Sequence, residues 1–144
     1  MTSTRPIPSH DDIRRLLGVS RNSLDPRSSA AITLILAHGF NENEIDHIRW
    51  SNVDLRRGSL VRTSRKRQAV EPLTELTVRQ LLALKPYSAS GRIFRPTKTH
   101  PTSLRNLLAS VMQAAGLAHL ATHDLVEWSR LQSQSVRLAI ATPA

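Results

Sequence analysis

The segment DPRSSAAITLILAHG, residues 25–39, constrains the fold of this chain more than any other stretch. Its central apolar run is interrupted by Thr33 alone, so a helix formed here has no polar face to turn toward solvent. Asp25 is suited to cap such a helix, Pro26 to open its first turn and Gly39 to end it in the left-handed conformation. We therefore predict a central helix over residues 26–38 that other elements surround.

The residues after Gly39 follow a distinctive order. A polar turn leads to a short helix, which Asn43 is suited to cap and which carries Glu44 and Ile45, and Trp50 then leads into a strand-like Val-Asp-Leu segment at residues 53–55. This order resembles the first catalytic box of the tyrosine recombinases, the phage-integrase family. The resemblance implies that family's catalytic-domain fold, mainly α with a small antiparallel β-sheet (α+β).

The resemblance also implies which positions would carry chemistry. The family has a phosphate-binding arginine two residues after the glycine, where this chain has Asn41. A second box, His-Asp-Leu-Arg in the family, reads His123-Asp124-Leu125-Val126 here, so Val126 replaces the second arginine. A lone histidine at a helix start is typical of a capping or core residue, although His123 remains a candidate phosphate contact.

The nucleophile of the family is a tyrosine well downstream of the second box. The single tyrosine of this chain is Tyr87, which lies before that box. We therefore expect a single integrase-like domain over residues 9–144 without the C-terminal tyrosine segment, preceded by a disordered lead-in at residues 1–8. Losing both guanidinium groups would remove stabilisation of the transition state, where one such donor is commonly worth about 3 kcal/mol. We expect no enzyme activity.

The charge of the chain indicates its partner. Twenty Lys and Arg against 11 Asp and Glu give a net charge of +9, which is typical of proteins that bind a polyanion, with solubility alone as the plainer explanation. No apolar run is long enough to span a bilayer, and the N-terminus lacks the apolar stretch of a signal peptide. We expect a cytoplasmic, nucleoid-associated protein that binds double-stranded DNA and no membrane.

One basic cluster lies in a predicted hairpin. Strands are expected over residues 59–63 and 69–73, and the cluster on or beside this hairpin comprises Arg62, Arg65, Lys66 and Arg67. It is either a solvated turn or a DNA contact. In the resembling family this hairpin carries a lysine that reaches the DNA; the family's spacing falls on Ser64, while the nearest lysine is Lys66.

A second basic surface is expected before and within a later helix. The apolar spacing predicts helices over residues 75–84 and 103–115, the latter capped by Thr102 and ended by Gly116, with Phe94 as a core anchor between them. An N-terminal helix capped by Ser9 and Asp12 should end near Gly18. The basic side chains near the second helix, which either contact DNA or line a solvated loop, are Arg92, Arg95, Lys98, His100 and Arg105.

Other chemistry finds no support in the sequence. Cysteine is absent, and no zinc-binding or nucleotide-binding motif occurs, so we expect no metal and no cofactor. Three functions stay open: a non-catalytic DNA-binding regulator of transcription or of a mobile genetic element, a module that pairs with an active recombinase, another protein or itself, and an enzyme completed by another chain's tyrosine. The DNA site, the regulated process, the oligomeric state and any protein partner are not encoded in a recognisable motif.

Overall fold

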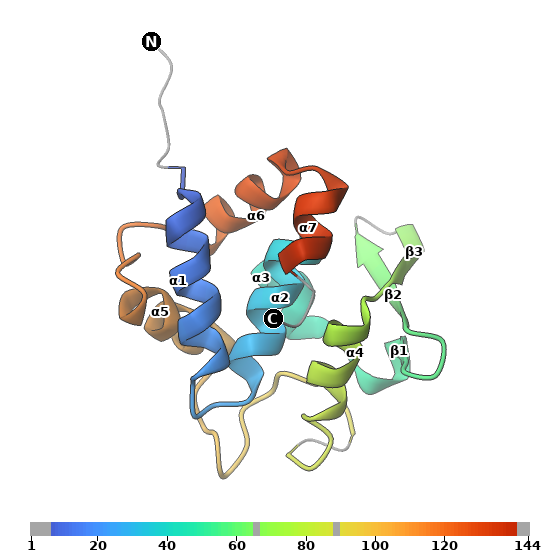
Figure 1. Cartoon of the computed structure of the whole chain (residues 1–144). Helices are drawn as coiled ribbons and strands as arrows, with labels where there is room; N and C mark the ends of the chain where they lie inside the picture. The colour runs from blue at the N-terminus through green and yellow to red at the C-terminus, as the bar shows by residue number, and fades with distance from the viewer. Residues whose placement is uncertain (1–6, 65–66, 88–89, 141–144) are drawn as a thin grey trace.

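A central helix organises the structure, a computed structural model that describes residues 7–64, 67–87 and 90–140. Helix α2 (Arg27–His38) is buried along nearly its whole length. It contacts α1, α3, α4, α5, α6 and α7 (Figure 1). A helix that is apolar on all sides is stable only when other elements cover it. The predicted central helix is confirmed.

The remaining elements follow one another around this helix. Before it lies α1 (His10–Arg21), and after it come α3 (Glu42–His47), the short 3-10 helix η1 (Trp50–Asn52), β1 (Val53–Asp54), β2 (Ser59–Ser64), β3 (Arg67–Pro72), α4 (Glu75–Leu82), α5 (Leu104–Ala114), α6 (Thr122–Leu131) and α7 (Gln134–Ile140). No helix in the part of the chain that the structure describes has the length and apolar character needed to cross a membrane.

Both ends of α2 are held by specific contacts. Asp25 accepts a hydrogen bond from the backbone N–H of Arg27 (3.0 Å) and pairs with its buried guanidinium, which also donates to the Phe94 and Thr102 carbonyls. At the other end Gly39 adopts φ 69° and donates to the Ile35 carbonyl at 3.1 Å. The conformation at Gly39 is the one that the sequence predicted, since residues with a Cβ rarely adopt it.

The sheet has the expected antiparallel arrangement. Its strand order is β1-β2-β3, with Leu60 opposite both Val53 and Glu71. Leu60 is buried in the core, whereas all residues of β3 except the half-buried Glu71 are exposed. The sheet therefore covers the core with Leu60 of β2 and Val53 of β1 and leaves β3 as an open edge (Figure 1).

Two predicted helix ends are wrong. Helix α1 continues past Gly18 to Arg21, because a glycine inside a helix costs only about 1 kcal/mol and the following turn packs Val19 and Ser20 against the core. Helix α5 is capped by Ser103 instead of Thr102, since the Ser103 hydroxyl accepts the backbone N–H of Asn106.

Helix α7 was not predicted from the sequence. It packs against α2 after the chain turns at Gln132 and Ser133, and Figure 1 shows it beside α2.

The predicted core anchor Phe94 is fully buried, and Gly116 ends the α5 region at φ 77°.

Candidate nucleic-acid interface

The short helix α3 is where three of the predicted DNA-binding arginines meet. Its carboxylates at Glu42, Glu44 and Asp46 pair with Arg105 (3.6 Å), Arg62 (2.7 Å) and Arg92 (3.3 Å), respectively. These arginines come from α5, β2 and the segment before α5. The structure therefore gathers side chains that the sequence keeps far apart, but it gathers them around acidic groups.

Arg62 is bound inside the protein. Its guanidinium donates to both carboxylate oxygens of Glu44 (2.7 and 3.0 Å) and to the His38 and Gly39 carbonyls (3.3 and 3.0 Å), and it lies 4.2 Å from the Phe40 ring centroid. The hydrogen bonds to Glu44 raise the pKa of Arg62 despite burial. These contacts differ from the expected DNA contact: Arg62 ties β2 to the end of α2.

The ion pairs of Arg92 and Arg105 are more exposed than that of Arg62. The Arg105 side chain is 82% exposed and that of Arg92 is 39% exposed. Exposed ion pairs of this kind are commonly worth less than about 1 kcal/mol. A DNA phosphate could therefore displace the carboxylate at Arg105 at small cost.

The alternating acids of α3 were visible in the sequence but not used in predicting the interface. Residues 42–46 read Glu-Asn-Glu-Ile-Asp, a pattern that places two carboxylates on one face of a short helix and the third on the opposite face. The sequence alone cannot show which acidic side chain lies beside which arginine, because each ion pair joins segments that are far apart in the chain.

The hairpin tip lies partly outside the described residues. Arg65 and Lys66 fall outside them, so the structure does not test their predicted role. Ser64 pairs with Arg67 in the register of β2 and β3, and the Arg67 side chain is exposed. The hairpin predicted from the sequence is thus confirmed in its strands, while the DNA contact at its tip stays a prediction.

Asn41 uses its side chain to start α3. Its carbonyl oxygen accepts the backbone N–H of Glu44 at 2.8 Å, and the Glu44 carboxylate accepts the N–H of Asn41 at 3.1 Å. This capping box replaces the predicted cap at Asn43. The position that the sequence resemblance matches to the family's arginine therefore serves the local fold here.

The second box lies at the start of α6, as predicted. Val126 is 1% exposed and belongs to the hydrophobic core, while Asp124 accepts the backbone N–H of Ala121 at 2.8 Å. His123 is exposed, and its Nε2 lies 3.7 Å from the Glu127 carboxylate. Of these residues only His123 presents a polar group to solvent in a way that suits contact with a phosphate.

The other members of the second basic surface lie in the segment before α5. The side chains of Arg95 and Lys98 are exposed. His100 is half-buried, and its ring packs edge-to-face against Tyr87 with centroids 5.2 Å apart. Arg95 and Lys98 are therefore placed where a polyanion can reach them, and His100 belongs to the packing of this segment.

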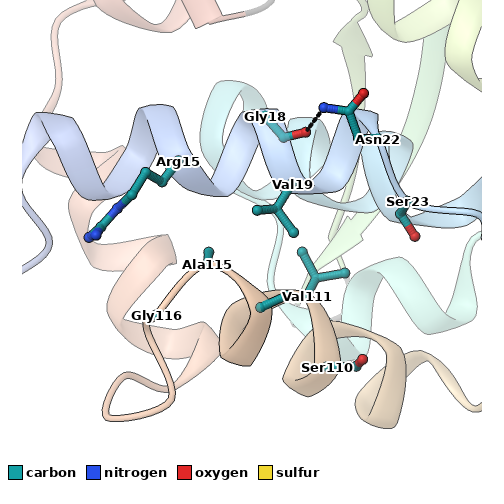
Figure 2. Close-up of a pocket in the computed structure, with 10 residues that line it drawn as sticks. Arg15, Gly18, Val19, Asn22, Ser23, Ser110, Val111, Ala115 and Gly116 are labelled. Carbon is teal, nitrogen blue, oxygen red and sulfur yellow. Dashed lines mark hydrogen bonds between the residues drawn. The ribbon is translucent and has the colours of Figure 1, made fainter.

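A groove of about 790 Å³ lies on another face, between α1 and α5. Figure 2 shows Val19 and Val111 pointing toward each other across it, with the Asn22 amide hydrogen-bonded to the Gly18 carbonyl. Arg15 is the one charged residue among those that line it. The groove offers no pair of groups for acid–base chemistry. Across the described ranges, no cluster of three or more His, Asp or Glu is placed to hold a metal ion.

Comparison with known proteins identifies the fold. The sequence matches no protein-family model and no curated protein. The XerA recombinase matches with a TM-score of 0.69 at 20% identity, over 88% of this chain and 50% of that one. The lambda integrase catalytic core matches with a TM-score of 0.61 at 15% identity, over 95% of this chain and 91% of that one. A structure of lambda integrase bound to DNA matches with a TM-score of 0.65 at 16% identity, over 99% of this chain and 56% of that one.

These matches confirm the predicted fold class. The chain has the fold of the tyrosine-recombinase catalytic domain, with a small three-stranded antiparallel sheet beside its helices. It spans about half the length of the XerA recombinase. At identities of 20% or less the likeness concerns the fold alone.

Proposed function

We propose that this chain is a non-catalytic DNA-binding protein built on the integrase fold, and that it regulates transcription or a mobile genetic element. The proposal rests on what the side chains do at the two positions that the resemblance matches to the family's arginines. Asn41 caps α3, and Val126 packs in the core. Neither side chain can donate a charged hydrogen bond to a phosphate.

The loss matters because phosphoryl transfer depends on charge stabilisation. Each guanidinium that binds the developing negative charge is commonly worth about 3 kcal/mol, so two missing groups cost roughly 6 kcal/mol or a factor of about 10⁴ in rate. Arg62, which lies nearest in the chain to Asn41 among the arginines paired with α3, is bound to Glu44 and two carbonyls and is therefore poorly placed to replace them.

The exterior of the chain keeps the means to hold duplex DNA. A net charge of +9 remains on the chain as a whole. The proposed contacts are the exposed side chains of Arg67, Arg95, Lys98, Arg105 and His123 and the half-buried Arg92. Arg65 and Lys66, which lie outside the described residues, complete the set. Contacts of this type position a protein on the phosphate backbone without reading bases.

The function is tested with a nicked duplex that traps covalent intermediates and with random duplex DNA at several salt concentrations. We expect non-covalent binding that weakens by about 0.9 log units per log unit of salt for each phosphate neutralised, and no covalent protein–DNA adduct. An adduct on the nicked substrate would show that the chain is catalytic. Absence of DNA binding at low salt would exclude the DNA-binding function.

Removing the cations of the hairpin tip should weaken DNA binding selectively. Changing Arg65, Lys66 and Arg67 together to alanine is expected to reduce affinity for all duplexes alike, since phosphate contacts carry no sequence information. The salt slope should fall by up to about 3, one for each lost contact. Electrophoretic mobility shifts at several salt concentrations measure both quantities, and the melting temperature should not change.

A matched control separates position from total charge. Changing Arg14, Arg57 and Arg79 to alanine removes the same number of exposed cations from α1, the β1–β2 turn and α4. If both triple variants lose affinity equally, the hairpin has no special role. If the hairpin variant binds DNA like the parent but loses a protein partner in a pull-down, the chain is an interaction module instead.

A further inference from the structure

A second cavity lies beside the end of α2, where His38 also accepts a hydrogen bond from Arg62 through its backbone carbonyl. It has a volume of about 600 Å³ and lies between the end of α2, the segment where β3 leads into α4, and the turn between α6 and α7. Figure 1 shows α7 beside α2 at this place. Its polar lining comprises His38, Glu71, Thr74, Gln132, Gln134 and Arg137. The volume lies in the range of small-molecule sites, roughly 300 to 1,000 Å³.

The cavity carries opposite charges that are not paired with each other. Within the described residues, the Glu71 carboxylate lies 3.7 Å from His38 Nδ1, and its charge is near enough to Arg62 to help raise the pKa of that guanidinium. The Arg137 guanidinium donates from Nε to the Ser129 carbonyl at 2.8 Å. A guanidinium has five donors and a carboxylate about four acceptor sites. Both groups therefore keep hydrogen-bonding capacity beyond these contacts.

His38 fixes one wall of the cavity. Its side chain is buried, and Nε2 lies 3.0 Å from the Thr77 hydroxyl, which in turn lies 2.8 Å from that of Thr74. The ring is thus held by partners on α4 and its cap, and its Nδ1 faces Glu71 on β3. Such a wall presents a carboxylate in a defined place, with apolar surface from Leu73 and Pro72 next to it.

The opposite charges of Glu71 and Arg137 argue against DNA, which the basic surface favours, as the ligand of this cavity. A DNA phosphate near Arg137 would also approach the Glu71 carboxylate. A simple cation would leave the Arg137 guanidinium without a counter-charge, and a simple anion would bring a second negative charge close to the Glu71 carboxylate, which is costly where both groups are partly removed from water. A molecule with both charges satisfies both groups.

We propose that this cavity binds a small zwitterion of about dipeptide size, with its ammonium group at Glu71 and its carboxylate at Arg137. The side-chain amides of Gln132 and Gln134 can both donate to and accept from the peptide unit between the two charged ends. Leu73 and Pro72 provide contact for an apolar side chain. This site is independent of DNA binding, since its lining includes none of the proposed DNA contacts.

Isothermal titration calorimetry with glycyl-leucine tests the site. N-acetylglycyl-leucine lacks the ammonium group, and glycyl-leucinamide lacks the carboxylate. We expect the free dipeptide to bind at least tenfold more tightly than either blocked form, and to raise the melting temperature at saturation. Equal affinity for all three compounds, or no binding of glycyl-leucine at millimolar concentration, would overturn the proposal.

Charge-neutral variants assign each end of the ligand. With Glu71→Gln, glycyl-leucine should bind no better than its acetylated form, whereas with Arg137→Gln it should bind no better than its amide. Arg137→Lys keeps the cation and should retain most of the selectivity. The control variants Glu75→Gln and Arg79→Gln alter an exposed pair on α4 and should leave both affinities unchanged. A loss of selectivity in the controls would contradict the assignment.

Discussion

The Leu34→Asp variant is expected to be unfolded. Leu34 is 0% exposed and lies in the middle of α2, the helix against which six other helices pack. An aspartate there would be a buried carboxylate without a partner, which costs several kcal/mol in addition to the lost apolar contacts. Total stabilities of domains are commonly about 5 to 15 kcal/mol. Circular dichroism and thermal melting measure the outcome.

Leu24 supplies the matched control for this variant. Its side chain is 98% exposed in the turn before α2, so Leu24→Asp makes the same chemical change in solvent. Its free energy of unfolding should lie within about 0.5 kcal/mol of the parent value. If Leu34→Asp melts as the parent does, α2 is not the centre of the core.

The Arg62→Ala variant should be strongly destabilised. Removing one partner of a largely buried ion pair leaves the other charge uncompensated, at a typical cost of about 3 kcal/mol or more, and the side chains of Arg62 and Glu44 are only 23% and 11% exposed. The variant also loses the contact with Phe40 and two carbonyl hydrogen bonds. For a chain of this size the melting temperature should fall by about 10 °C.

The acid side of the stability profile gives an independent readout of the same pair. Burial raises the pKa of Glu44, but hydrogen bonds from Arg62 and from the Asn41 backbone, together with the Arg62 charge, outweigh it and hold the pKa below the ordinary value of 4.5. The stability gained is therefore complete above pH 4.5 and is lost as the pH falls through the lower folded value. The Arg62→Ala variant should lose less stability than the parent on acidification.

Arg67→Ala distinguishes a structural arginine from a DNA contact on the same hairpin. The Arg67 side chain is exposed on β3, so its removal should change the free energy of unfolding by less than about 0.5 kcal/mol while weakening DNA binding. If Arg62→Ala instead melts as the parent does and binds DNA weakly, Arg62 is the DNA contact that the sequence predicted.

The sequence by itself determined the features that depend on neighbouring residues. The apolar run before Gly39 predicted α2, because a helix of that composition must be buried wherever it lies. The spacing of leucines predicted α5, and the alternation around residues 59–72 predicted the hairpin of the sheet. The absence of arginine at Asn41 and Val126 was likewise readable without a structure.

Only the tertiary structure decided which charges are paired. Arg62 is separated from Glu44 by 18 positions, and Arg92 from Asp46 by 46. Their pairing depends on where β2 and the segment before α5 pass α3. The same holds for the cavity, whose acidic and basic groups come from β3 and α7. Periodicity and capping act between residues within a few positions of each other, whereas these contacts exist only after the chain has folded around α2. A cluster of basic residues in the sequence therefore could not show which arginine faces solvent and which is bound inside the protein.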